Sequence, residues 1–161
     1  LNNNTTKWSY TIFNYLPLNF DLQNSTIISL LSPTTANGTL LLDVRTIINS
    51  SSTSLLNSQT ILCSNSSLNQ IKGSKYYYGI YNGSQIQVYT YCQNCLPIWT
   101  MNAWNIVNFD FCGPWFLYSL NGVIYQLYAD NGSFISSLQT NYTSPQVKPL
   151  EVNSECLVNI F

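Results

Sequence analysis

Five cysteines carry the most reactive side chains of this 161-residue chain: Cys63, Cys92, Cys95, Cys112 and Cys156. The spacing Cys92-Gln-Asn-Cys95 occurs in thiol redox motifs and in half of many zinc sites. A redox motif lacks its usual βαβ context here, and the chain has no His to complete a zinc site. We therefore expect disulfides, with at most two bridges inside the chain and one sulfur left over. We expect at least one disulfide to join distant parts of the fold, and Cys92, Cys95 and Cys112 are the favoured participants because they flank the central predicted strands.

Acid–base and nucleophilic catalysis lack their usual residues. Without His, Ser-His-Asp and Cys-His arrangements and type 1 copper sites are excluded. The six carboxylates show no pattern that would pair two of them for glycoside hydrolysis. They are Asp21, Asp43, Asp110, Asp130, Glu151 and Glu155. The sequence thus predicts a protein that is not an enzyme and holds no metal or cofactor.

Nine Asn-x-Ser/Thr sequons offer a different chemistry, because each Asn can accept an N-linked glycan. They start at Asn3, Asn4, Asn24, Asn37, Asn49, Asn65, Asn82, Asn131 and Asn141. A glycan acceptor must be exposed on an exported protein. Only 7% of the residues are charged, so sugar and neutral polar side chains must keep the surface hydrated. This pattern predicts an extracellular glycoprotein at a cell surface.

The charge and hydropathy patterns exclude two classes of partner. The chain has five basic and six acidic residues, a net charge of −1, and no basic patch that could neutralise phosphates. We therefore expect no nucleic-acid partner. No run of about 18 apolar residues is present, so we expect no membrane span. The length suits one domain with a sizeable core.

Strand-forming residues recur along the whole chain, and two Asn-Gly pairs predict hairpins with type I′ turns. Asn82-Gly83 separates Tyr76–Tyr81 from Ser84–Tyr91, and Asn121-Gly122 separates Trp115–Leu120 from Val123–Tyr128. Other expected strands are Thr26–Leu31, Thr39–Ile48, Ser54–Leu62, Ile98–Phe109, Ser133–Thr140, Gln146–Val152 and Cys156–Phe161. About ten strands at this spacing predict an all-β fold, an antiparallel β-sandwich (Ig-like or pilin-like) with a protruding N-terminal strand.

That N-terminal strand covers Lys7–Tyr15, where apolar and polar residues alternate. Leu16-Pro17 follows, and Pro17 cannot donate to a strand ladder, so we expect an interruption there. The predicted organisation is an arm at residues 1–16 and a sandwich domain at residues 17–161. The arm is either an edge strand of its own domain or a strand that leaves its subunit.

Aromatic residues supply a further candidate surface. Four tryptophans could form a platform for sugar binding, or could belong to the core or an interface. They are Trp8, Trp99, Trp104 and Trp115.

Several features occur together in this chain: dense sequons, scarce charge, abundant Tyr, Asn, Ser and Thr, no His, and a separate first strand. In these respects the chain resembles the subunits of archaeal threads, the glycosylated pili of thermoacidophilic archaea. The resemblance implies donor-strand complementation, in which the strand at Lys7–Tyr15 completes the sheet of an adjacent identical subunit in a head-to-tail filament for adhesion or cell–cell contact. Its side chains would be Trp8, Tyr10 and Ile12 on one face and Phe13 and Tyr15 on the other. Two alternatives are a receptor-binding domain of a viral surface glycoprotein and a secreted carbohydrate-binding module.

Overall fold

The computed structural model describes residues 15–23, 25–33, 39–49, 52–62, 69–152 and 155–160, and every regular element in these ranges is a β-strand. All neighbouring strands pair antiparallel in chain order, with no crossover between sheets. The prediction of an all-β antiparallel fold with sheets packed face to face is confirmed.

The strands form four sheets, each made of strands consecutive in the sequence. The first sheet contains β1 (Tyr15–Gln23), β2 (Thr26–Pro33), β3 (Thr39–Asn49) and β4 (Ser52–Leu62). The second contains β5 (Gln70–Gly73), β6 (Tyr77–Tyr81), β7 (Gln85–Thr90) and β8 (Trp99–Asn102). The third contains β9 (Ile106–Cys112), β10 (Trp115–Leu120), β11 (Val123–Tyr128) and β12 (Phe134–Gln139). The fourth contains β13 (Val147–Val152) and β14 (Glu155–Ile160).

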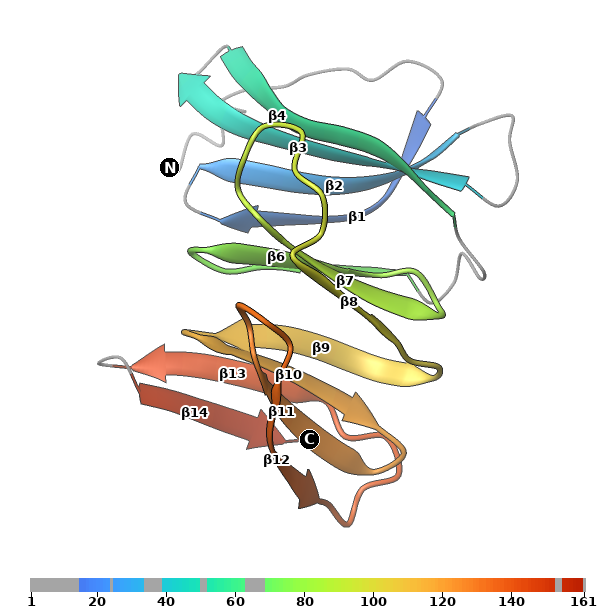
Figure 1. Ribbon diagram of the computed structural model, residues 1–161, viewed down its shortest axis with the longest axis vertical. Helices are drawn as coiled ribbons and strands as arrows, with labels where there is room; N and C mark the ends of the chain where they lie inside the picture. Colours follow the sequence, from blue (N-terminus) through green and yellow to red (C-terminus); the bar gives the residue numbers. More distant parts are fainter. Residues whose placement is uncertain are drawn as a thin grey trace, which may run out of the picture.

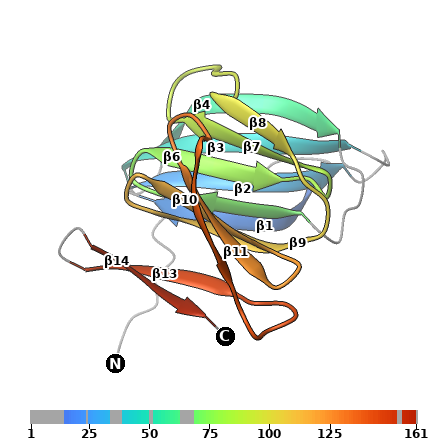
Figure 2. The ribbon, with the colours of Figure 1, turned by 60° about the horizontal axis from the view of Figure 1, so that its bottom comes forward.

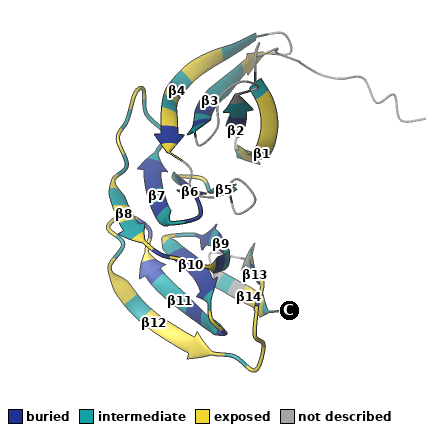
Figure 3. Cartoon of the chain, turned by 90° about the vertical axis from the view of Figure 1, so that its right-hand side faces the viewer, coloured by how far each residue is buried: buried dark blue, intermediate teal, exposed yellow. Residues whose placement is uncertain are grey.

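The sheets stack in the order of the chain (Figures 1 and 2). The first strand of each sheet contacts the first strand of the next, so that β1, β5, β9 and β13 lie on one side of the stack. The last strands β4, β8 and β12 lie on the opposite side (Figure 3). A β-sandwich consists of two packed sheets, whereas this chain packs four sheets in succession.

Alternating apolar side chains build a separate core between each pair of sheets, because successive strand residues point to opposite faces. Between the first and second sheets, the core includes Ile28, Leu30, Leu42, Ile71, Tyr78 and Tyr89. Between the second and third, it includes Ile86, Val88, Phe109, Phe111, Phe116 and Leu127. Between the third and fourth, it includes Cys112, Leu117, Ile124 and Val147.

The three tryptophans in the described ranges differ in exposure and in surroundings. Trp99 packs edge-on against Phe116, with ring centroids 5.3 Å apart, and its Nε1 donates to the Ala129 carbonyl at 2.8 Å. Trp104 is exposed in the loop between β8 and β9, and Trp115 is half-buried at the start of β10. Trp8 lies outside the described residues.

A polar side chain from each first strand reaches the main chain of the next one. Asp21 Oδ2 on β1 accepts from Gly73 N on β5 at 2.6 Å. Gln70 Nε2 on β5 donates to the Val107 carbonyl on β9 at 2.8 Å. Asn108 on β9 makes the corresponding contact with β13. These contacts fix the spacing of the stack where the apolar cores end.

The two Asn-Gly turns differ from each other. At Asn121-Gly122 both residues have positive φ, 51° and 79°, as a type I′ turn requires, and Leu120 pairs directly with Val123. The Asn82-Gly83 hairpin also forms, but its outermost paired residues in the ladder are Tyr81 and Ile86, and residues 82–84 lie between β6 and β7. Only Gly83 has positive φ there, so the type I′ prediction was wrong at this turn.

Two predicted strand boundaries need correction. The strand expected at Ile98–Phe109 is two strands, β8 and β9, separated by a loop in which Asn105 has a positive φ of 61°. Pro17 lies inside β1, where the register with β2 shifts between Pro17 and Asn19. The expected interruption is therefore a local irregularity, and the first sheet already includes Tyr15.

Candidate functional site

The described ranges contain no group of three or more His, Cys, Asp or Glu side chains that could hold a metal ion. Three charged residues come closest to forming a cluster: Asp21, Lys72 and Asp110, on the first strands of three sheets. The charges of Lys72 and Asp21 both influence the pKa of Asp110. Burial raises the pKa of Asp110 above its ordinary value, and the Phe111 N–H and the Lys72 charge oppose this shift. The cluster lies between packed strands, so its clearest effect is on stability rather than on a substrate.

Four of the five cysteines form two disulfides, Cys92–Cys95 and Cys112–Cys156. Cys112–Cys156 joins β9 to β14 across 44 residues of sequence. Cys112–Cys156 is thus a disulfide of the expected kind, joining distant parts of the fold, whereas Cys92 and Cys95, the other favoured participants, pair with each other in the β7–β8 connection. Cys63 lies outside the described residues. Two disulfides are compatible with an extracellular protein.

Four sequon asparagines fall within the described ranges, and three of them are exposed: Asn49, Asn131 and Asn141. The other five, Asn3, Asn4, Asn24, Asn37 and Asn65, lie outside these ranges. At Asn131, Oδ1 accepts from the Ser133 N–H at 2.8 Å, as in an Asx turn, while the side chain stays at the surface.

Asn82 does not fit the expectation of a glycan at a hairpin tip. Its side chain is only 7% exposed, and its Nδ2, the atom that would carry a glycan, donates to the Leu62 carbonyl at 3.0 Å. Its Oδ1 accepts from the N–H groups of Ser84 and Gln85. Asn82 thus ties the β6–β7 loop to the end of β4.

The residues predicted to form the donor strand are Trp8, Tyr10, Ile12, Phe13 and Tyr15. The first four lie outside the described residues. Tyr15 begins β1 and pairs with Pro33 of its own sheet. Tyr15 and Leu16 of the predicted arm, residues 1–16, pair with β2 of their own sheet, so residues 1–14 are the part of the arm that an exchange could involve.

The strongest surface candidate is the face of the first sheet turned away from the second sheet, which we call the end face. Paired residues of antiparallel strands share a face, so the register defines its members. One row is Phe20, Ser29, Asp43 and Ser58, and the next is Leu22, Ile27, Arg45 and Leu55. The other described sheets lie on the opposite side of the first sheet (Figure 1).

The exposed part of the end face is concentrated on the edge strand β1. Phe20 is 70% exposed and Leu22 is 53% exposed, and both side chains lie on this face. Leu16 and Leu18 of the same strand are 58% and 44% exposed. An edge strand with several exposed apolar side chains is a pairing site for another chain.

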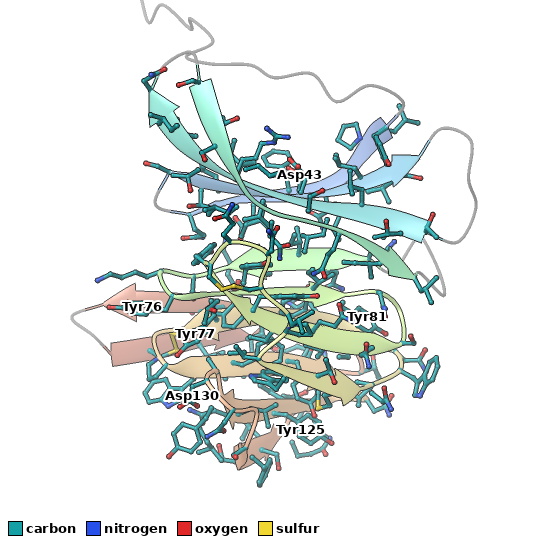
Figure 4. The ribbon with its side chains drawn as sticks, turned by 45° about the horizontal axis from the view of Figure 1, so that its top comes forward. Asp43, Tyr76, Tyr77, Tyr81, Tyr125 and Asp130 are labelled. Carbon is teal, nitrogen blue, oxygen red and sulfur yellow. A yellow bond between two sulfur atoms is a disulfide. The ribbon has the colours of Figure 1, made fainter. Side chains whose placement is uncertain are left out.

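Electrostatics leaves the end face close to neutral. Asp43 lies on the first sheet (Figure 4), and its side chain is only 2% exposed. Arg45 Nε lies 2.8 Å from Asp43 Oδ2. The two charges cancel within one strand. A charged partner would therefore find little to recognise there, whereas an apolar β-strand would bury the side chains that are exposed.

Sequence reasoning missed this surface, although a signal was present. In β1 the polar residues Asn19, Asp21 and Gln23 alternate with Leu18, Phe20 and Leu22. The interruption predicted at Pro17 separates this alternation from the predicted strand at Lys7–Tyr15.

No protein-family model matches this chain, and no curated protein matches it. Among solved structures, BamB from Moraxella catarrhalis is similar with a TM-score of 0.46 and 10% identity, covering 85% of this chain and 49% of that chain. The AfRom2 CNH domain is similar with a TM-score of 0.37 and 9% identity, covering 87% of this chain and 62% of that one. Neither likeness supports an inference about function.

The chain thus spans about half to two thirds of the length of these two structures. No helix in the described part of the chain is long and apolar enough to cross a bilayer.

Proposed function

We propose that this chain is a structural subunit of an extracellular, N-glycosylated filament, held together by contacts between identical subunits. The observation that carries the proposal is the edge strand β1, whose four large apolar side chains are all exposed. Burying such a side chain stabilises an assembly by about 1.5–3 kcal/mol. Several of them together would support a durable contact between subunits.

The partner that suits this surface is a second copy of the chain. The side chains that β1 exposes on the end face are apolar, the charges of Asp43 and Arg45 on the same face pair with each other, and residues 7–14 provide an alternating segment with Trp8, Tyr10 and Ile12. A strand from a neighbour satisfies an open sheet edge with main-chain hydrogen bonds and buries alternate side chains. This is the donor-strand mode that the resemblance to archaeal threads implies.

The direction of such a contact determines the form of the assembly. The arm of one subunit and the end face of the next are different surfaces, so the contact is head-to-tail. Contacts of this kind that do not close into a ring propagate as a filament. Adhesion or cell–cell contact is the role we infer for a glycosylated filament at a cell surface.

The experiment compares full-length protein with two matched double variants by sedimentation and electron microscopy. Phe20→Ser with Leu22→Ser removes the exposed apolar side chains of the end face. Phe134→Ser with Leu138→Ser changes two similarly exposed residues on β12, the edge strand of the third sheet. We expect filaments to be lost in the first variant and kept in the second.

A third sample tests the arm itself. Removal of residues 1–14 should also abolish filaments, and a peptide spanning residues 5–14 should bind the truncated protein. The proposal is wrong if full-length protein is a stable monomer, or if the end-face variant polymerises as well as the β12 variant.

A further inference from the structure

The disulfide Cys92–Cys95 lies in the connection between β7 and β8, at the surface of the protein. Both cysteines are half-buried, and Asn94 and Leu96 on either side of Cys95 are exposed. Cys112 of the second disulfide is only 3% exposed. Exposed disulfides are the ones that thiols in solution can attack. Cys92–Cys95 is therefore the more accessible of the two bridges.

The two bridges also differ in how much of the fold depends on them. Cys92–Cys95 joins residues three apart, whereas Cys112–Cys156 joins residues 44 apart. In the chain-entropy model, the stabilisation by a disulfide grows with the length of the loop that it closes. Opening Cys92–Cys95 therefore costs the folded state little.

The loop around this disulfide is held by hydrogen bonds that do not involve sulfur. The Asn94 N–H donates to the Leu56 carbonyl at 2.9 Å, and Asn57 Nδ2 donates to the Cys95 carbonyl at 3.2 Å. Leu56 and Asn57 belong to β4, and Asn57 is buried. These bonds remain when the disulfide opens, and they keep the two cysteines, whose Cα atoms are 5.6 Å apart, next to each other. The bridge can therefore open and close again without unfolding the loop.

The two sulfur atoms have different neighbours. Thr90 Oγ1 lies 3.4 Å from Cys92 Sγ, and the hydroxyl is the donor, because a disulfide sulfur has no hydrogen to give. Cys95 Sγ instead lies 3.7 Å from the Gln93 carbonyl oxygen, which cannot donate. A hydrogen bond to a charged group is stronger than one to a neutral group, so the Thr90 hydroxyl favours a thiolate at Cys92.

This difference determines which sulfur leaves when the bridge opens. A thiol with a lower pKa is the better leaving group in thiol–disulfide exchange. Every regular element in the described ranges is a strand, so the hydroxyl of Thr90 takes the part that a helix N-terminus plays in other exchange sites. Cys92 is thus the leaving sulfur, and Cys95 is the sulfur that is attacked.

We propose that Cys92–Cys95 is a thiol–disulfide exchange site, which accepts the thiolate of another molecule at Cys95 Sγ. In the first step a bond forms between the incoming sulfur and Cys95 Sγ. The Cys92–Cys95 bond breaks, and its electron pair passes to Cys92 Sγ as a thiolate that accepts from Thr90 Oγ1. The product is a mixed disulfide at Cys95.

A second thiolate completes the exchange. It attacks the incoming sulfur of the mixed disulfide and expels Cys95 as a thiolate, which takes up a proton, as Cys92 does. Two thiols are thereby oxidised to one disulfide, and Cys92–Cys95 is reduced to two thiols. The site lies in the β7–β8 connection, away from β1, and does not depend on the proposed assembly.

The incoming thiol could be a small molecule or a cysteine of a protein. Leu96 is 79% exposed and Ile98 is 41% exposed, and both follow Cys95 in the same connection. Apolar side chains beside the attacked sulfur suit a cysteine that lies among apolar residues of a peptide chain. The two sources are separated below by the choice of probe.

Mass spectrometry of the native protein tests the first step. The protein is mixed with free cysteine, quenched early with acid, treated with N-ethylmaleimide and mapped without reduction. We expect the cysteine adduct on Cys95 and the maleimide on Cys92. Cys112–Cys156 should open more slowly, by about tenfold or more. Mapping assigns each adduct to its position, so a reaction at Cys63 is counted separately.

Three variants test the hydroxyl. Thr90→Val keeps the shape of the side chain but removes the donor, and it should slow the opening of Cys92–Cys95 by about three- to tenfold. Thr90→Ser keeps the hydroxyl and should restore the rate. Thr100→Val makes the same change at an exposed position on β8 and should leave the rate unchanged.

A second probe identifies the source of the thiol. It is a short peptide with one cysteine between apolar residues, compared with free cysteine on the unmodified protein and on Leu96→Ser. A faster reaction of the peptide that Leu96→Ser abolishes identifies a protein thiol. Equal rates for both probes identify a small thiol.

Three results would overturn the proposal. The first is opening of Cys92–Cys95 no faster than that of Cys112–Cys156. The second is an adduct that forms first on Cys92. The third is an equal rate in Thr90→Val and Thr100→Val, which would remove the reason for Cys92 to leave. The first two are measured on the unmodified protein and do not depend on the folding of any variant.

Discussion

Asn108 holds the main chain of Val147 through both of its polar groups: Nδ2 donates to the Val147 carbonyl at 2.8 Å, and the Val147 N–H donates to Asn108 Oδ1 at 2.9 Å. One side chain thus provides the pair of hydrogen bonds that a strand residue would otherwise exchange. Ser119 Oγ donates to the same Oδ1 at 2.9 Å and holds the amide in place. The contact joins the third sheet to the fourth.

Replacing Asn108 with Ala should therefore destabilise the protein by about 2–3 kcal/mol. Two hydrogen bonds are lost, and the polar groups of Val147, which is 2% exposed, lose their partners. Asn159→Ala removes an exposed amide from β14 and should change the free energy of unfolding by less than about 0.5 kcal/mol. Urea unfolding of both variants measures the difference. Equal effects would contradict a special role for Asn108.

The two disulfides should differ in their contribution to stability. In the chain-entropy model, a bridge that closes a 44-residue loop contributes about 4 kcal/mol, and one between residues three apart about 1.5 kcal/mol. Cys112→Ser with Cys156→Ser should accordingly lower the melting temperature more than Cys92→Ser with Cys95→Ser. Thermal unfolding checks the ranking, and non-reducing peptide mapping checks the pairing. Recovery of a Cys92–Cys112 peptide would show that the pairing is wrong.

Glycan occupancy should follow the exposure of the acceptor nitrogen. We expect glycan at Asn131 and Asn141, which are exposed, and none at Asn82, whose Nδ2 is bonded to the Leu62 carbonyl. Mass spectrometry of glycopeptides from native material measures each site separately. Full occupancy at Asn82 would mean that its contact with Leu62 is absent when the protein is glycosylated.

Asp110 should make stability fall as pH rises. Its pKa in the folded protein lies above the ordinary value of 3.8, chiefly because of burial. The folded state therefore keeps a proton that the unfolded state has lost, so the free energy of unfolding decreases between pH 3.8 and the folded pKa. Asp110→Asn should flatten this part of the profile, because an amide does not titrate. Chemical denaturation of the unmodified protein and of Asp110→Asn across this pH range measures the effect. Asp130→Asn, at an exposed turn, is the control.

Local patterns in the sequence were enough to predict the class of fold. Asn121-Gly122 gave the expected turn because both residues can adopt positive φ without help from the rest of the molecule. The prediction of a type I′ turn at Asn82 was wrong for the opposite reason. Its conformation depends on a bond to Leu62, 20 residues earlier, which no local pattern contains.

The candidate surfaces were harder to predict, because they depend on which strands become neighbours. Phe20 and Leu22 look like ordinary core residues until β1 is placed at the edge of a terminal sheet. The short strand β5, with Lys72 and Gly73, carries too few residues for its alternation to stand out.

The order of the sheets has a consequence for how the chain could fold while it is being made. Every sheet is complete before the first strand of the next one begins, so a chain that emerges from its N-terminus can pair each sheet in turn without waiting for distant segments. Such local pairing lowers contact order and favours fast, vectorial folding. The exception is Cys112–Cys156, which can close only after β14 has been made, whereas Cys92–Cys95 can close as soon as the β7–β8 connection has appeared.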